Sequence, residues 1–546
     1  MTQATLRQAA PWHALGSARL QALAALLALA VLVAFGWRDD GLWFLGDAPR
    51  HLLTGVFIAD LLRAWPADPL AYALGYYARY PVIVPLVYPP GFHLLEGLAF
   101  LVLPVSPWVG KGLVVLATAA MALYAGLWAR RWLAPQAGWA AALLVTMPGV
   151  MRYGNGVLLN MPAAALGLAL LYHVRRWLDT ASRGHLAAAI GLAVACVLTY
   201  YPALLSVVVA LVWALPARRW RLLLGWAALL LVPVIGLALL PGELAPAHLL
   251  RNLPALGKLR DAQAWLFYPR ALVELAGWPL AALAAIGLVA GLRSERWRSE
   301  ARQLLLGLLV VVACLLPLPP VDVRYALPAL PLLVLAAMIG PLVWSARRPH
   351  SANWTWAVPA ALVPALALQS FLGPRPAAIV GHDQVAAYLA AHGRADGVLY
   401  AGGQEANLGV YLRAGDPTLQ ARLVLASQLL WAAEAGPGFE RKMRPLVDGP
   451  QAMLDRIRSH CGCRWVAWEV RTDSKLLPGE QQLRQLLESP AFEPVASFAL
   501  RSPGSPRLDL FRARFEPGPV PARDLRFPFF TDRVFPAVLP LGLPPP

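Results

Sequence analysis

The chain has 546 residues, of which 58% are hydrophobic and 14% charged, and its formal net charge is +17. A soluble domain carries roughly 25% charged residues, so this composition argues against a soluble protein and favours one that crosses a membrane several times. The charge does not indicate a nucleic-acid partner, because the arginines stand in short clusters between apolar runs, which is the pattern of cytoplasmic loops.

The first long apolar run, residues 20–36, is long enough to cross a bilayer. Charged residues follow it instead of a small-residue cleavage site, so we predict a retained first helix and not a signal peptide. With the N-terminus in the cytoplasm, residues 37–107 form a first outer loop. The apolar run at residues 91–104 is short for a span, and a crossing there would put the later arginine clusters outside. We therefore predict an interfacial or re-entrant helix on the outer surface.

About eleven spans place every double-arginine loop inside the cell, which predicts a multi-pass protein of the bacterial inner membrane. The transmembrane domain covers residues 1–373, and we see no internal repeat in it. The predicted spans are residues 20–36, 108–128, 137–150, 157–174, 186–200, 202–216, 222–240, 271–291, 303–318, 326–344 and 354–372.

After about Gly373 the long apolar runs stop and polar side chains become frequent. Alternating helix and strand patterns over residues 374–515 predict a small α/β domain, which by parity is periplasmic. Residues 516–546 are rich in proline and are predicted to form an extended or poorly ordered tail. Helices are predicted at residues 382–392, 452–460 and 480–487, and strands at residues 397–401, 419–425, 464–469 and 492–500.

The four cysteines do not indicate a metal centre. Cys196 and Cys314 lie in apolar runs and are predicted core residues. Cys461 and Cys463 form a lone C-x-C pair beside His460, and a metal site needs more ligands than these. No glycine-rich nucleotide loop precedes a helix, which argues against a nucleotide-sugar donor. We therefore predict neither a metal nor a cofactor.

An acidic cluster follows the first helix directly. Asp39, Asp40 and Asp47 belong to it, although the whole chain has only 30 acidic residues. Acids at a membrane surface, with an arginine three residues beyond Asp47, suggest chemistry on a lipid-borne substrate. Glu96 stands in the apolar stretch of the same loop. It is a functional candidate if it lies at membrane depth, or it faces water on an interfacial helix.

Four motifs stand in a fixed order between residues 37 and about 345. They are Asp47-Ala48-Pro49-Arg50-His51, Tyr88-Pro89-Pro90-Gly91-Phe92-His93, Arg152-Tyr153-Gly154-Asn155-Gly156 with Leu159-Asn160-Met161-Pro162, and Arg324-Tyr325 before Pro328 and Pro331. With them the chain resembles the GT-C class of membrane glycosyltransferases, close to the protein O-mannosyltransferase and aminoarabinose transferase group (glycosyltransferase family 39-like). The C-terminal α/β region looks like the outer domain of many bacterial members.

The resemblance implies a GT-C fold and an enzyme that transfers a sugar from a polyprenyl-phosphate carrier to a lipid, glycan or protein acceptor on the periplasmic side. The sequence departs from the family pattern at three positions. Ala48 stands where a second acid often follows the catalytic aspartate. Tyr88 stands where a basic residue often precedes the proline pair, and Asn160 stands where an acid is common.

Transfer from such a carrier needs a base for the acceptor and cations for the departing phosphate. Asp47 fits the base and Arg50 fits the phosphate ligand, because a guanidinium matches phosphate oxygens. If residues 47–60 are helical, these two side chains share a face. The alternatives are that Asp47 caps a helix and that Arg50 is an interfacial arginine reaching the headgroups.

The remaining candidates each have a plain structural alternative. His51 binds substrate or is a packed interfacial ring, and Tyr88 and His93 line the carrier path or form an aromatic belt. Arg152 and Asn160 contact substrate, or Asn160 is an ordinary helix cap. Arg324 is a second phosphate ligand or pairs with Asp322. Lys258 lies in a long basic outer loop, residues 242–270, which is a plausible gate over the carrier phosphate.

Two other functions compete with sugar transfer. A lipid-linked sugar transporter or flippase without chemistry would be expected to show internal repeats and a polar site between broken helices at mid-membrane. A catalytically silent scaffold would use the outer domain for partner binding, and Ala48 keeps this alternative open. The absence of a visible repeat and the acidic cluster at one outer surface argue against the transporter, and our interpretation remains a glycosyltransferase, inverting in mechanism.

Overall fold

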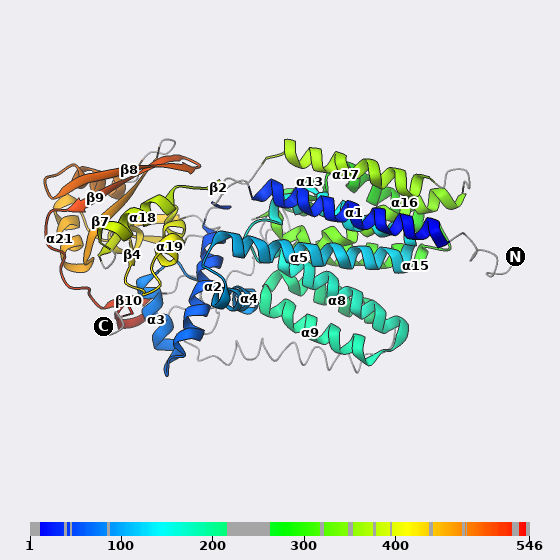
Figure 1. The fold of residues 1–546 in the computed structure, drawn as a ribbon, viewed down its shortest axis with the longest axis horizontal. Coiled ribbons are helices and arrows are strands. Elements are labelled where there is room, and N and C mark those ends of the chain that lie inside the picture. The colour runs from blue at the N-terminus through cyan, green and yellow to red at the C-terminus, as the bar shows by residue number, and fades with distance from the viewer. Residues whose placement is uncertain are drawn as a thin grey trace. The chain divides into compact units, whose positions relative to one another are not determined.

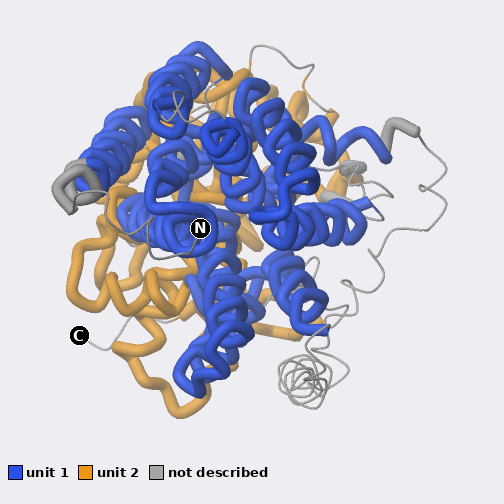
Figure 2. Tube along the Cα trace, turned by 90° about the vertical axis from the view of Figure 1, so that its right-hand side faces the viewer, with its two compact units in different colours: residues 1–38, 88–92, 111–375 blue, residues 39–87, 93–110, 376–546 orange. Residues whose placement is uncertain are grey.

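A computed structural model of the protein describes residues 11–37, 41–43, 46–84, 88–215, 262–316, 322–347, 353–374, 378–393, 396–435, 441–471, 476, 478–526 and 534–541. The chain divides into two compact units (Figure 2). Unit 1 contains residues 1–38, 88–92 and 111–375. Unit 2 contains residues 39–87, 93–110 and 376–546, so it combines most of the first outer loop with the C-terminal region.

Unit 1 is helical throughout the part that the structure describes (Figure 1). Its helices are α1 (Pro11–Gly36), α5 (Pro107–Trp128), α6 (Ala140–Thr146), α7 (Pro148–Tyr153), α8 (Asn160–Thr180), α9 (Arg183–Thr199), α10 (Leu204–Ala214), α13 (Ala262–Ala276), α14 (Trp278–Leu292), α15 (Arg298–Leu315), α16 (Leu330–Arg347) and α17 (Trp354–Leu372).

Four helices in the described residues are long and apolar enough to cross a membrane: Ser17–Gly36, Pro107–Leu133, Val323–Arg347 and Trp354–Leu372. A fifth candidate is the pair Trp265–Ala276 and Trp278–Leu292, which is bent by 109°. The bend falls at Gly277, whose φ of 82° favours glycine. Together with the shorter apolar helices, these segments support a membrane protein, and the count of eleven spans stays a prediction.

Two predicted spans are broken in the structure, residues 271–291 at Gly277 and residues 137–150 at Met147. Residues 137–150 form two short helices, α6 and α7, because the chain turns at Met147 with ψ of 138° before Pro148. Proline disfavours a helical conformation for the residue before it and supplies no N–H to continue the helix. The predicted span at residues 222–240 lies outside the described residues.

The first outer loop forms three helices: α2 (Asp47–Ala64), α3 (Pro69–Arg79) and α4 (Gly91–Val102). The start of α3 is fixed by Asp68, whose carboxylate accepts a hydrogen bond from the Ala71 amide, with Pro69 at the first helical position. Because α4 has only 12 residues, it is shorter than the roughly 20 residues that a spanning helix needs.

The C-terminal region of unit 2 is an α/β structure, as predicted. Its five-stranded sheet has the order β4 (Arg422–Leu425), β3 (Gly397–Ala401), β7 (Cys463–Val470), β9 (Ser505–Ala513) and β8 (Phe492–Ser502). β3 pairs in parallel with β4 and β7, whereas β9 pairs antiparallel with β7 and β8. The surrounding helices are α18 (His382–His392), α19 (Glu405–Ala414), α20 (Ala426–Leu429), α21 (Pro450–His460) and α22 (Pro478–Leu487).

All three helices and four strands predicted in this region are confirmed within a few residues at their ends. The sequence reasoning missed α19, β9 and the hairpin of β5 (Trp431–Ala435) and β6 (Arg441–Pro445). In the tail, which was predicted to be extended or poorly ordered, β10 (Arg523–Arg526) and β11 (Val534–Val538) are extended and pair as antiparallel strands. Cys461 and Cys463 form a disulfide at the end of α21.

The first outer loop and the C-terminal region are joined within unit 2 at several places. β1 (Leu42–Trp43) pairs with β2 (Ala378–Ile379) in register Leu42 to Ile379. The backbone amide of Leu541 donates to the carbonyl of Gly75 in α3 at 3.1 Å. These long-range bonds explain why the compact units do not follow the predicted division at residue 373.

Candidate functional site

Asp47 is the first residue of α2 and is partly exposed. Gly46 occupies the cap position with φ of 84°, so the alternative that Asp47 itself is the N-cap is wrong. A carboxylate in the first turn is still stabilised by the positive end of the helix dipole. The helix runs without a break to Ala64, so Asp47 and Arg50 lie on the same face, as the spacing predicted.

Arg50 is partly buried and makes an ion pair that the sequence did not indicate. Its Nη2 lies 2.6 Å from Oε1 of Glu405, the first residue of α19. The side chains are 29% and 16% exposed, respectively, so solvent screens this pair less than one at an open surface. A residue of its own unit therefore fixes the guanidinium of Arg50. This ion pair limits how an anion could bind to Arg50.

His51 and His93 lie together in unit 2, although 42 positions separate them in the sequence. His51 Nδ1 and His93 Nε2 are 3.0 Å apart, so one ring donates a hydrogen bond to the other. The rings stack with centroids 5.2 Å apart, and both are buried. This arrangement fits the packed-ring alternative for His51.

Glu96 is fully buried beside this histidine pair, so the alternative that it faces water is wrong. Neither carboxyl oxygen has a hydrogen-bond partner within the described chain. The side chain packs on α2 at Gly55, where an added Cβ would lie 2.6 Å from the Cβ of Glu96. Burial without a partner strongly disfavours a charged carboxylate, so Glu96 is expected to be a neutral acid here.

A second buried acid of the loop, Asp60, is fully paired. Both carboxylate oxygens accept from Arg413 in α19, with Nη2 at 2.5 Å and Nε at 2.8 Å. The hydroxyl of Tyr76 in α3 donates to the same carboxylate at 2.9 Å. Burial first, and then the charge of Asp60, raise the pKa of Tyr76, so its hydroxyl remains a donor. Burial alone would lower the pKa of Arg413, but its bonds to Asp60 raise it overall.

In unit 1, three predicted residues lie around the ring of Tyr200. The ring of Tyr88 has its centroid 6.2 Å from that of Tyr200. The side chain of Asn160, which is buried, hydrogen-bonds to Tyr200. Arg324 lies within electrostatic range of the same hydroxyl. The chain thus brings Tyr88, Asn160 and Arg324 together from three separate motifs.

Two of the predicted cations of unit 1, Arg324 and Arg152, have acidic partners. Arg324 Nε lies 2.7 Å from Oδ2 of Asp322, so the predicted alternative of a salt bridge is confirmed. Arg152 lies 3.2 Å from Glu274 and also covers the ring of Tyr153. Neither pair excludes a substrate contact, because an arginine carries several donors. Lys258 and most of its loop, together with Asp39 and Asp40, lie outside the described residues.

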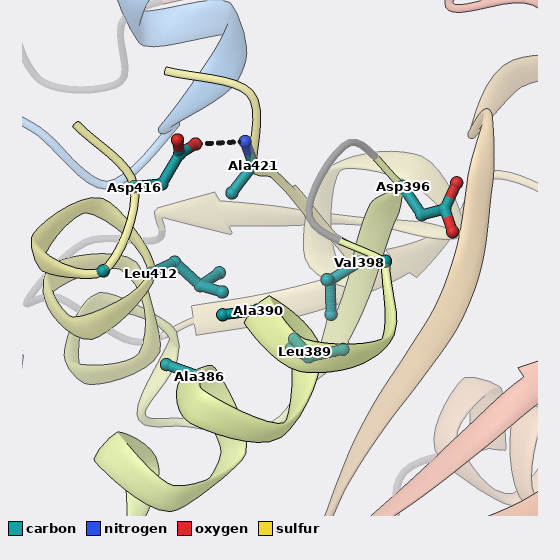
Figure 3. Close-up of a pocket in the computed structure, with 10 residues that line it drawn as sticks. Ala386, Leu389, Ala390, Asp396, Val398, Leu412, Asp416 and Ala421 are labelled. Carbon is teal, nitrogen blue, oxygen red and sulfur yellow. Dashed lines mark hydrogen bonds between the residues drawn. The ribbon is translucent and has the colours of Figure 1, made fainter. Parts of the chain in front are cut away.

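A small cavity in unit 2 lies between α18, α19 and β3 (Figure 3). Leu389, Val398 and Leu412 line it, and Asp416 at its edge accepts a hydrogen bond from the Ala421 amide. Its volume of about 10 Å³ has room for about one water molecule, far below the several hundred cubic ångströms of a small-molecule site. This cavity is therefore not a sugar site.

The part of the chain that the structure describes contains no group of three or more His, Cys, Asp or Glu side chains placed to hold a metal ion. Cys461 and Cys463 are bonded to each other.

The fold is that of the GT-C membrane glycosyltransferases, as the resemblance implied, whereas the number of spans and the periplasmic location stay predictions. Among solved structures the chain is similar to ArnT from Cupriavidus metallidurans, both bound to undecaprenyl phosphate and in the apo state. Each match has a TM-score of 0.57 and 14% identity and covers 91% of this chain. The matches cover 99% of the ArnT chain in the bound structure and 98% in the apo structure. The mycobacterial arabinofuranosyltransferase AftD matches with a TM-score of 0.46 and 18% identity, over 93% of this chain and 41% of AftD. No family profile and no curated protein sequence matches.

Sequence reasoning missed Asp60, Tyr76, Glu405 and Arg413. Asp60 did give a local signal, because it is an acid between Ala59 and Leu61 in a largely apolar helix. An acid in that position needs a partner or exposure to water. Nothing in the sequence indicated that the partner is Arg413, which follows more than 350 positions later.

Proposed function

We propose that this protein is an inverting glycosyltransferase that moves a sugar from a polyprenyl-phosphate carrier to an acceptor on the periplasmic side of the inner membrane. The observation that carries the proposal is that 91% of the chain matches the GT-C fold of an ArnT that was crystallised with undecaprenyl phosphate. The apolar helices of unit 1 fit a carrier with a long hydrocarbon chain.

In this proposal Asp47 is the general base for the acceptor hydroxyl or amine. The proton passes from the acceptor to the carboxylate, the acceptor oxygen or nitrogen forms the new bond to the sugar, and the carrier phosphate leaves with the bonding pair. Two features support Asp47: it begins a long helix with its carboxylate partly exposed, and Arg50 shares its face. A base beside a cation suits a reaction that creates negative charge on a phosphate.

The remaining roles are proposed residue by residue. Arg50 binds the carrier phosphate in place of Glu405, because a phosphate offers a guanidinium more acceptor oxygens than one carboxylate does. Arg324 and Arg152 of unit 1 are proposed as phosphate-binding residues, and Lys258 as another from its basic loop. Tyr88 and Asn160 of unit 1 and His51 and His93 of unit 2 are proposed as substrate-binding residues. No metal or cofactor is assigned to the reaction.

The first experiment follows release of sugar from a panel of radiolabelled polyprenyl-phosphate sugars by the purified protein in nanodiscs. We expect Asp47→Asn to lower release by about 100-fold or more, which is the typical effect of losing a general base. Asp68→Asn is the matched control. It removes the charge of another acid in the same loop, and asparagine can replace Asp68 as the cap of α3. This variant should keep activity within a few-fold of the wild type.

Each outcome separates the competing functions. Release that is lost in Asp47→Asn but kept in Asp68→Asn supports the transferase and its base. Release that survives Asp47→Asn retains the enzyme but removes Asp47 from the role of base. If the wild-type protein binds carriers but releases no sugar from any of them when acceptor mixtures are supplied, a transporter or a scaffold replaces the enzyme.

A further inference from the structure

Helix α2, which begins with Asp47, is held along its length by helix α19 of the C-terminal region (Figure 1). Two ion pairs join the helices in the described residues: Arg50 with Glu405 near their N-terminal ends, and Asp60 with Arg413 further along. Because the two pairs follow the same order in both helices, α2 and α19 run in the same direction. Both helices belong to unit 2.

Between these two ion pairs, side chains of the first outer loop pack closely on the backbone of α19 at Gly409. An added Cβ at Gly409 of α19 would lie 2.9 Å from Val82 and 3.4 Å from Leu53 of α2. Leu53 is fully buried, and Val82 follows α3 in the same loop. The absence of a side chain at Gly409 therefore lets α19 pack directly on the first outer loop, and a small shift of α19 would displace α2.

The pair of Asp60 and Arg413 is the more deeply buried of the two. The side chains are 6% and 5% exposed, compared with 16% and 29% for Glu405 and Arg50. The guanidinium also donates through Nη1 to the carbonyl of Asp416 at 2.9 Å, and Tyr76 adds a bond from α3 to Asp60. A buried bidentate ion pair with these additional hydrogen bonds can form in only one register of the two helices.

Helix α19 is itself anchored to the central sheet. The carboxylate of Glu469 on β7 accepts hydrogen bonds from the amides of Gly403 at 2.7 Å and Gln404 at 3.1 Å, directly before the first residue of α19. The amide of Gln404, the cap residue of α19, is one of the donors at the start of a helix that have no partner within the helix, where an acid is favoured. The sheet thus fixes α19, and α19 fixes α2 through Arg413.

We propose that Arg413 is a positioning residue for the sugar-transfer reaction, acting through Asp60 on the helix that carries Asp47. This inference rests on the proposed function, because it assigns to the C-terminal α/β region the task of setting the position of the general base. Arg413 does not touch the substrate in this proposal. A buried ion pair is a weak source of stability compared with apolar packing, but it discriminates strongly between registers, which suits a positioning role.

The test compares Arg413→Gln, Asp60→Asn and the double variant with the wild type in the sugar-release assay. Arg413→Gln should lower kcat by about 10- to 100-fold, because a displacement near 1 Å can reduce a rate by about 100-fold. The KM for the donor should stay within about threefold of the wild type, since no phosphate ligand is removed. The double variant should resemble the more impaired single variant, because both changes break the same link.

Arg175→Gln is the matched control. Arg175 of α8 makes an ion pair with Glu300 of α15 at 2.6 Å, with the side chains 15% and 11% exposed, but both residues belong to unit 1. We expect this variant to lower the melting temperature to a similar degree while kcat stays within about twofold of the wild type. Arg413→Lys keeps the charge with fewer donors and should give an intermediate kcat, which provides a graded variant if Arg413→Gln does not fold.

Amide hydrogen exchange tests the positioning separately from the chemistry. In Arg413→Gln, or in Arg413→Lys if only that variant folds, the amides at residues 50–60 should exchange at least about tenfold faster than in the wild type, whereas Arg175→Gln should leave them unchanged. Unchanged exchange in α2, or an unchanged kcat alongside a lowered melting temperature, would overturn the positioning role. If the wild type releases no sugar, the proposed function fails and the exchange result alone decides whether Arg413 holds α2.

Discussion

At the scale of single residues, the buried titratable side chains of this protein fall into two groups. Some are charged and paired with a partner, and others are uncharged. Asp60 has Arg413 and Tyr76, and Glu469 has two backbone amides. Glu96 has no partner among the described residues, and His382 is fully buried in the C-terminal region. The same principle governs both groups, since transferring an unpaired charge from water into the protein is unfavourable.

His382 is held in its neutral form by its surroundings. The hydroxyl of Tyr400 donates to Glu469 at 2.8 Å, so His382 Nε2, at 3.3 Å, must donate to the Tyr400 oxygen. His382 Nδ1 then carries no proton and has no partner in the described chain. Burial lowers the pKa of His382 to about 4, and the nearby charges of Glu469 and Asp383 only partly oppose this.

We predict that the folded C-terminal region loses stability as the pH falls from about 6.5 towards 4. Between these values the unfolded chain binds a proton at His382 that the folded chain does not, so acid favours unfolding. Each pKa unit corresponds to roughly 1.4 kcal/mol, and the complete effect is roughly 3 kcal/mol. Thermal unfolding of the wild type and His382→Gln between pH 4 and 8 measures it. A melting temperature that falls equally steeply with acid in both proteins would contradict the prediction.

At the scale of elements, some close helix contacts depend on a glycine, because the neighbouring helix leaves no room there for a side chain. α2 meets α4 at Gly55, where an added Cβ would lie 2.6 Å from Glu96 Cβ and 3.0 Å from Glu96 Oε2. The hydrogen-bonded pair of His51 and His93 lies one turn away on the same two helices. The sequence predicted the helix of residues 91–102 and its apolar character, but it gave no information on which helix it packs against.

Gly55→Ala is therefore expected to destabilise the protein by about 1 to 3 kcal/mol through overpacking. The usual effect of this substitution inside a helix is the reverse, a gain of up to about 1 kcal/mol. Gly191→Ala in α9 is the control, because nothing lies within 4 Å of a Cβ added there. Melting temperatures of both variants in the same detergent check the prediction, which is contradicted if Gly55→Ala is as stable as Gly191→Ala.

At the scale of the whole molecule, the compact units are not continuous in sequence. Residues 39–87 and 93–110 belong with residues 376–546, although residues 111–375 of unit 1 lie between them in the sequence. The strand pair of Leu42 with Ile379, the ion pair of Asp60 with Arg413 and the bond from Leu541 to Gly75 make this connection. The region predicted as a separate outer domain thus folds together with the loop that carries Asp47.

We predict that unit 2 opens as one cooperative unit. In native-state hydrogen exchange with increasing denaturant, amides of α2 and of β3 should converge to the same opening free energy and the same denaturant dependence. Amides of α16 in unit 1 should follow a different dependence. Mass spectrometry of the exchanging full-length protein resolves these segments. If α2 follows α16 instead of β3, the first outer loop unfolds with the membrane helices and the division into units is wrong.

The sequence by itself determined the class of protein, most helices, the α/β character of the C-terminal region and the GT-C fold. These features depend on local pattern: apolar runs of spanning length, alternating strand and helix periods, and motifs in a fixed order. Residues 382–392 and 492–500 could be assigned because the period of each segment is carried by its own side chains.

Only the tertiary structure decided how the candidate site is held. The partners of Arg50 and Asp60 lie more than 350 positions away in α19, a helix that the sequence analysis missed. A buried charge can be satisfied by any residue of opposite charge that the fold brings near it, and sequence distance carries no information about that choice. The physical reason is that burial, close packing and charge pairing belong to the folded chain as a whole, whereas periodicity and composition belong to each segment alone.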